Sequence, residues 1–135
     1  MLTTLVLCMA NCTAPIAQAD ELGSLSGLYV QLCYEMHHLH DAYCPEIIPP
    51  VIMQCVTEID RALPLRNSAD FKKGMKILHQ KFASELKAKT NKKFAQRLSE
   101  DSGDVAGTCR IIDEENRKQR FQILQSIKNI SSRSN

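Results

Sequence analysis

This 135-residue sequence contains no tryptophan, only five glycines and five prolines, and no alternating runs of β-branched residues. The shortage of glycine and proline excludes collagen-like and low-complexity chains, and the missing alternation argues against a β-sheet protein. No stretch reaches the roughly 18 consecutive apolar residues of a membrane-spanning helix, so we expect no membrane span. Hydrophobic residues form 44% and charged residues 24% of the chain, which is typical of one globular domain.

Recognisable catalytic patterns are also missing. The chain has no G-x-S-x-G, no H-E-x-x-H, no C-x-x-C and no glycine-rich phosphate loop. The adjacent acids 113–115 point apart on a helix, and His79 stands alone, so neither forms a catalytic pair. We therefore predict that the protein is not an enzyme and needs no cofactor.

Basic residues are absent from the first 60 positions. That segment carries seven acidic residues and no Lys or Arg, a net charge of −7, whereas residues 61–135 carry 17 basic and eight acidic residues, a net charge of +9. Such asymmetry between two parts of a chain bears on binding partners rather than on the fold.

The N-terminal segment has the character of a secretory signal peptide. Residues 1–19 are apolar and end in Ala17-Gln18-Ala19, whose small residues suit a signal peptidase, although no basic residue precedes the apolar run. We predict a signal peptide over 1–19, a single domain over 20–130 and a flexible tail over 131–135. The predicted compartment is a bacterial periplasm, with secretion from the cell as the alternative.

Four cysteines remain after residue 19, an even number that predicts two disulfides in an exported protein. Cys33 and Cys44 are about 16 Å apart along a continuous helix, too far for a bond between them. Two pairings remain, either Cys33–Cys55 with Cys44–Cys109 or Cys44–Cys55 with Cys33–Cys109. We favour the first, because a hairpin that turns near Ile47 brings Cys55 closer in height to Cys33.

Apolar residues recur at three- and four-residue steps almost throughout, which predicts helices. We expect helices over 24–42 and 51–62, a third from Ser68 to about Leu98 with a bend or break near Thr90–Asn91, and a last one over 105–130. Ser99–Gly103 should form a polar loop, with Ser102 or Asp104 capping the last helix. The predicted fold is all-α, a small irregular bundle of about four helices stapled by two disulfides.

A cluster of histidines lies near the end of the first predicted helix. His37 and His40 share a face with Cys33 and Cys44, and His38 lies beside them. Histidine and cysteine are common zinc ligands, so a periplasmic metal or small-ligand carrier that uses His37, His38 and His40 is the alternative function. We assign no metal site here, because Cys33 and Cys44 are about 16 Å apart along the helix, too far for one ion to bind all four residues; His37 and His40 are the candidates if one exists.

The segment 61–97 is strongly basic, with 11 Lys and Arg against two acids, a net charge of +9. No nucleic-acid-binding motif accompanies these residues, so we expect a protein partner, of acidic character, and no nucleic acid. A homodimer is a further option. The predicted contact residues are Lys72, Lys76, Lys87, Lys92, Lys93, Arg97, Ser99, Glu100 and Asp101.

In size, export signal, helical pattern and two expected disulfides, the chain is similar to small periplasmic immunity proteins that neutralise cell-wall-degrading toxins. This resemblance covers the architecture and rests on no motif. It implies a binding protein that works as an inhibitor by covering a surface of its partner.

Overall fold

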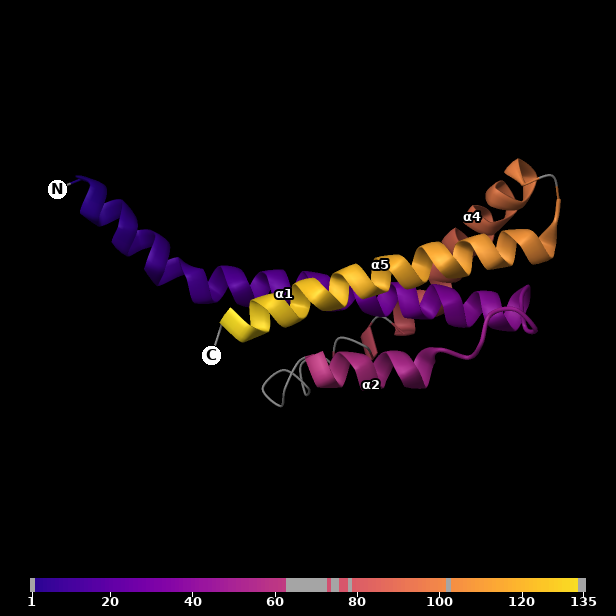
Figure 1. Ribbon diagram of the computed structural model, residues 1–135, viewed down its shortest axis with the longest axis horizontal. Coiled ribbons are helices and arrows are strands. Elements are labelled where there is room, and N and C mark those ends of the chain that lie inside the picture. The colour runs from indigo at the N-terminus through magenta and orange to yellow at the C-terminus, as the bar shows by residue number, and fades with distance from the viewer. Residues whose placement is uncertain (1, 63–72, 74–75, 78, 102, 134–135) are drawn as a thin grey trace.

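The computed structural model describes residues 2–62, 73, 76–77, 79–101 and 103–133 (Figure 1). These residues form helices and connecting turns, and no strand occurs among them. The helical elements include α1 (Leu2–Ala42), α2 (Ile52–Ala62), the π-helical turn η1 (Phe82–Leu86), α4 (Lys87–Glu100) and α5 (Val105–Arg133). The predicted all-α bundle with two disulfides is confirmed.

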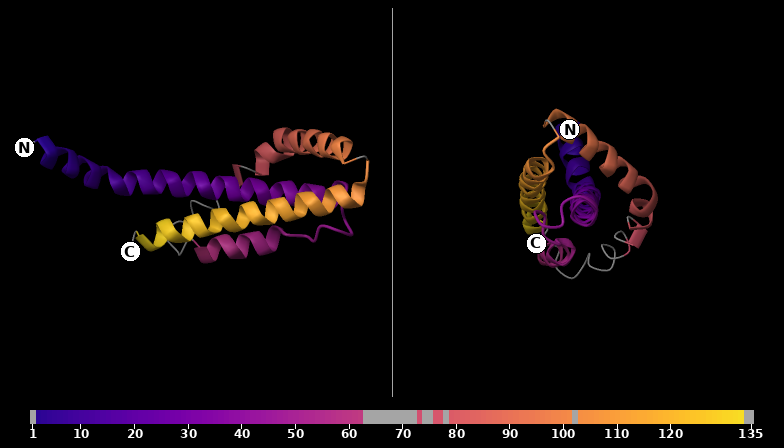
Figure 2. Two further views of the ribbon diagram at one scale, coloured as in Figure 1. Left: turned by 45° about the horizontal axis from the view of Figure 1, so that its top comes forward. Right: turned by 90° about the vertical axis from the view of Figure 1, so that its right-hand side faces the viewer.

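Helix α1 is the central element of the bundle. Helices α5, α2 and α4 all contact it, and α2 and α5 also contact each other. Seen end-on, α5 and α4 lie on opposite sides of α1, with α2 beside α5 (Figure 2). The two long helices α1 and α5 run antiparallel, and α1 extends beyond the others at its N-terminal end (Figure 1).

The end of α1 follows the sequence closely. The peptide N–H groups of Tyr43 and Cys44 both donate to the carbonyl of Leu39, at 3.0 and 2.8 Å, which closes the last turn. Pro45 prevents the helix from continuing. The chain then reverses through a tight turn in which the N–H of Ile48 donates to the carbonyl of Cys44 at 2.9 Å. Because Ile48 is fully buried, this turn anchors the start of the connection to α2.

The core lies where α1 meets its three neighbours. Tyr29 and Met36 of α1, Ile59 of α2 and Ile127 of α5 are completely buried. Each of these side chains removes apolar area from water, and a fully buried one of this size contributes about 1.5–3 kcal/mol.

Both disulfides have the favoured pairing. Cys33–Cys55 joins α1 to α2 with a Cα–Cα distance of 6.3 Å, and Cys44–Cys109 joins the turn after α1 to α5 at 6.0 Å. The pairing favoured from the sequence is therefore confirmed, because α2 does run back along α1 from a turn near Ile47.

The predicted break at Thr90–Asn91 is wrong. Helix α4 passes through both residues without interruption, and the irregularity occurs earlier, in η1. The inward positions along this segment recur every four residues, slightly more than the 3.6 residues of an α-helical turn. Successive positions therefore drift by only about 40°, so four of them stay on the side of a regular α-helix that faces the core. They are Leu86, Thr90, Phe94 and Leu98, all buried or half-buried.

Some predicted features lie outside the described residues. These include the start of the third predicted helix at Ser68, the candidate cap Ser102 and the predicted contact residue Lys72. At the other end of the chain, α5 continues to Arg133, past the predicted domain boundary at residue 130. No helix among the described residues is both long enough and apolar enough to cross a membrane.

Candidate functional site

Several of the basic residues predicted to bind a partner lie on α4 and on the described residues that precede it. We call Lys76, Lys81, Lys87, Lys89 and Lys92 the basic face; all five are exposed. Among the described residues, none of the five has a carboxylate within ion-pair distance. The face therefore presents positive charge to solvent that the described part of the protein does not neutralise.

Phe94 and Asn91 attach α4 to the end of α1. The ring of Phe94 stacks on Tyr43, with the ring centres 4.4 Å apart and the planes 14° from parallel. Beside this stack, the Tyr43 hydroxyl donates to Asn91 Oδ1 at 3.0 Å, and His38 Nε2 lies 2.6 Å from the same oxygen. Aromatic stacking and two polar contacts hold α4 in a fixed orientation on α1.

Two predicted contact residues instead form ion pairs within the protein. Lys93 lies 3.8 Å from Glu35 of α1, and Arg97 lies 3.1 Å from Glu115 of α5. Both pairs are at the edges of α4, where they connect this helix to its neighbours. Because they are already paired, Lys93 and Arg97 contribute less to the external field than the basic face does.

The Glu35–Lys93 pair leads to a pH prediction. Burial raises the pKa of Glu35 above its ordinary value of 4.5, and Lys93 only partly opposes this shift. Folding therefore favours the protonated carboxyl, and the stability it contributes is present below pH 4.5 and lost as the pH rises through the folded-state pKa. We expect Glu35→Gln to raise the melting temperature at neutral pH, and the gain to disappear in acid.

Thermal melts of both proteins across this pH range would test the prediction. Glu46→Gln, at an exposed carboxyl, is the matched control and should change little at any pH. If Glu35→Gln lowers the melting temperature at neutral pH, the ion pair with Lys93 outweighs the cost of burial.

The polar loop after α4 is more tightly held than its composition suggests. Ser99 and Glu100 are exposed at the end of α4, as a contact surface requires. Asp101, however, is half-buried and accepts a hydrogen bond from the hydroxyl of the buried Thr108 at 3.1 Å. Gly103 has a φ of 77°, which glycine adopts without strain and which allows the sharp turn into α5.

The histidine cluster is divided among several partners. His37 Nε2 lies 3.4 Å from Asp41, His38 contacts Asn91, and His40 Nδ1 contacts the carbonyl of Ile48. The neighbouring cysteines are in two different disulfides. Among the described residues, no three His, Cys, Asp or Glu side chains are grouped as metal ligands would be.

A buried polar network, which was not predicted from the sequence, connects α1, α2 and α5. The amide of Asn116 donates to the carbonyl of Leu32 at 3.1 Å and accepts from Arg120 Nε at 2.7 Å. Arg120 Nη1 then reaches Cys55 Sγ at 3.5 Å. The one signal in the sequence is that Asn116 interrupts the apolar stripe of α5; the amide is buried, as that position implies.

Beside this network, the Tyr29 hydroxyl donates to Glu58 Oε2 at 2.6 Å. Burial, the hydrogen bond to Glu58 and the charge of Glu58 together raise the pKa of Tyr29 far above its ordinary value, while Arg120 acts in the opposite direction. The phenol therefore stays protonated at neutral pH and serves as a donor.

An open groove of about 450 Å³ runs between α2 and α5. Its polar side chains include Glu58, Asp113 and Arg120, and the exposed ring of Phe121 forms part of its rim. Asp113 is paired with Arg117 of the next turn, so positive and negative groups alternate along this groove. The groove therefore carries charges of both signs, whereas the basic face carries positive charges only.

No protein-family model, curated protein or solved structure matches this chain. The fold and the site therefore define its class: an all-α bundle, fixed by two disulfides, whose outer helix α4 presents lysines without a carboxylate partner among the described residues.

Proposed function

We propose that this is an exported binding protein that attaches through its basic face to an acidic surface of a protein partner. It acts by covering that surface, as an inhibitor or immunity protein does for a cell-wall-degrading toxin. The observation that supports this proposal is the row of exposed lysines on and before α4 that have no carboxylate partner among the described residues. Unneutralised charge of one sign accelerates encounter with an oppositely charged partner.

The scaffold supports the same proposal. The stacking of Phe94 on Tyr43 holds the middle of α4 against the end of α1, and the disulfide Cys44–Cys109 joins the turn after α1 to the start of α5. A rigid surface binds more tightly than a mobile one, since little conformational freedom is lost on association. Two disulfides also suit an oxidising compartment, which agrees with export and the periplasm as the proposed location.

Charge reversal of the basic face should weaken partner binding. We expect the triple variant Lys76→Glu, Lys87→Glu and Lys92→Glu to slow association by about tenfold or more and to flatten its dependence on salt. The physical reason is that the rate gain from steering disappears when the sign of the field is reversed. Partners would be captured from periplasmic extract by the natural protein, identified by mass spectrometry, and their binding kinetics measured at several salt concentrations.

The control variant must have the same net charge as the triple variant of the basic face but leave the basic face unchanged. Arg61→Glu, Arg110→Glu and Lys128→Glu together change three exposed residues on α2 and α5, and this variant should associate almost as fast as the natural protein. Equal slowing by both triple variants would mean that total charge matters and the basic face does not. Circular dichroism of both variants would confirm that each remains helical.

An anionic lipid surface is the main competitor as a binding target. Vesicles with and without phosphatidylglycerol separate the two possibilities. Retention on the anionic vesicles, lost in the triple variant of the basic face and accompanied by no captured protein, would replace the proposed partner by a membrane surface.

A further inference from the structure

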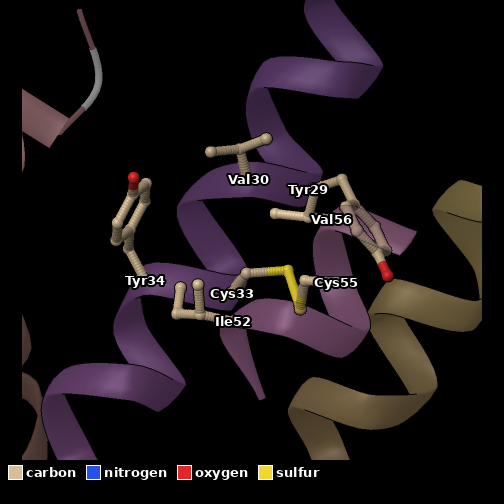
Figure 3. Close-up of a pocket in the computed structure, with 7 residues that line it drawn as sticks. All are labelled: Tyr29, Val30, Cys33, Tyr34, Ile52, Cys55 and Val56. Atoms are coloured by element: carbon tan, nitrogen blue, oxygen red, sulfur yellow. A yellow bond between two sulfur atoms is a disulfide. The ribbon is translucent and has the colours of Figure 1, made fainter. Parts of the chain in front are cut away.

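The two sulfur atoms of the disulfide Cys33–Cys55 have different neighbours. It lies at the bottom of an apolar notch between α1 and α2, with Tyr34 and Val30 on one side and Tyr29 on the other (Figure 3). The notch has room for about one water molecule. Both cysteines are nearly buried, with 2% and 3% of their surface exposed.

A cation lies next to one sulfur of this bond. Arg120 of α5 is 6% exposed, and its Nη1 is 3.5 Å from Cys55 Sγ. The same guanidinium is oriented by the bond from its Nε to Asn116. Cys33 Sγ has no such contact among the described residues, although both cysteines line the notch together with aliphatic and aromatic side chains.

The other charged and titratable groups near Cys55 are already engaged with each other. Glu58 of α2 accepts the hydrogen bond from Tyr29 of α1, and the Tyr29 phenol is neutral. Arg120 is therefore the cation best placed to interact with Cys55. A guanidinium beside a cysteine stabilises the thiolate relative to the thiol.

We propose that Cys33–Cys55 is a thiol–disulfide exchange site, opened by an external thiolate that attacks Cys33 while Cys55 leaves as a thiolate beside Arg120. Exchange is faster when the leaving sulfur is the more stable thiolate, which fixes the direction of attack. Cys33 lines the notch, and because the notch has room for only about one water molecule, a local opening of the structure precedes the attack.

This exchange needs no reactant other than the external thiol. The bond between Cys33 Sγ and Cys55 Sγ breaks, a bond forms between Cys33 Sγ and the thiol sulfur, and the electron pair remains on Cys55 Sγ. A second thiolate then attacks the sulfur of the first thiol. This releases Cys33 as a thiolate and leaves the two external thiols joined as a disulfide.

The second disulfide provides an internal reference. Cys44 and Cys109 are 2% and 0% exposed, and no Lys or Arg side chain donates to either sulfur among the described residues. Any treatment that merely unfolds the protein exposes both bonds. A difference between the two bonds within one molecule therefore reports local chemistry.

The experiment exposes the intact oxidised protein to a small monothiol, glutathione, at neutral pH. The reaction is stopped with acid at intervals, free thiols are alkylated, and peptides are mapped by mass spectrometry. We expect Cys33–Cys55 to open about tenfold faster than Cys44–Cys109, with glutathione on Cys33 and the alkyl group on Cys55. Glutathione predominantly on Cys55, or prior opening of Cys44–Cys109, would overturn the proposal.

A variant tests the part assigned to Arg120. Arg120→Gln should reduce the ratio of the two opening rates about tenfold, whereas Arg117→Gln, at an exposed arginine one turn earlier, should leave the ratio unchanged. An unchanged ratio in Arg120→Gln would show that the guanidinium does not direct the exchange. A general loss of stability would lower the ratio by speeding the opening of Cys44–Cys109, whereas loss of the guanidinium lowers it by slowing the opening of Cys33–Cys55. Each rate is therefore also compared with its value in the natural protein, and a lower ratio that comes only from faster opening of Cys44–Cys109 would overturn the part assigned to Arg120.

Discussion

Replacing Cys44 and Cys109 together by alanine should lower the free energy of unfolding by about 4 kcal/mol. The two cysteines are separated by 65 positions, so without their bond the unfolded chain gains the entropy of a long open segment. For a domain of this size the melting temperature should fall by about 10–20 °C. Thermal unfolding followed by circular dichroism measures both changes.

The matched comparison is the Cys33→Ala and Cys55→Ala double variant. Its bond closes a shorter loop, with a sequence separation of 22, and the expected loss is about 3 kcal/mol. The order of the two losses is the decisive result. If the shorter loop costs as much as the longer one, loop entropy does not govern the stability of this protein, and packing around the two bonds in the folded state must account for the result.

Asn116→Ala should destabilise the protein by about 2–3 kcal/mol, because it removes two buried hydrogen bonds and one of them is to a charged group. Without the amide, Arg120 Nε loses its partner inside the core, and the carbonyl of Leu32 loses a donor from α5. A buried donor left unpaired cannot be rehydrated, so its desolvation is no longer compensated. Chemical denaturation with urea gives the change in free energy.

Gln119→Ala is the control for this prediction. It removes an amide from the same helix, three residues further on, at an exposed position. Its effect should stay within about 0.5 kcal/mol. A similar loss in both variants would indicate that helix propensity of α5, rather than the buried network, sets the cost.

The pattern of apolar residues in the sequence was informative about helices and about their ends. The end of the first helix before Pro45 and the span of α2 were predicted within one residue, because proline and apolar spacing act locally along the chain. The disulfide pairing was also accessible, since a short turn between two helices fixes which cysteines face each other. That the chain has a basic segment follows from counting alone.

The irregularity before α4 could not be located from the sequence. Apolar residues spaced by three or four positions are compatible with an α-helix throughout this segment, so the spacing gives no sign of a π-helical turn. The structure places one in η1, ahead of the helix that carries Phe94 to its contact with Tyr43.

Which lysines remain available to a partner was likewise a tertiary result. Lys92 and Lys93 are adjacent and identical in the sequence, yet Lys93 faces Glu35 and Lys92 has no carboxylate nearby among the described residues. Asn116 and Gln119 both interrupt the stripe of α5, but only Asn116 is buried in a network. The sequence by itself determined the helical class, the two disulfides and the excess of positive charge, since these depend on local pattern and composition. The tertiary structure decided which polar groups are paired, because pairing depends on the side chains that distant segments bring within a few ångströms.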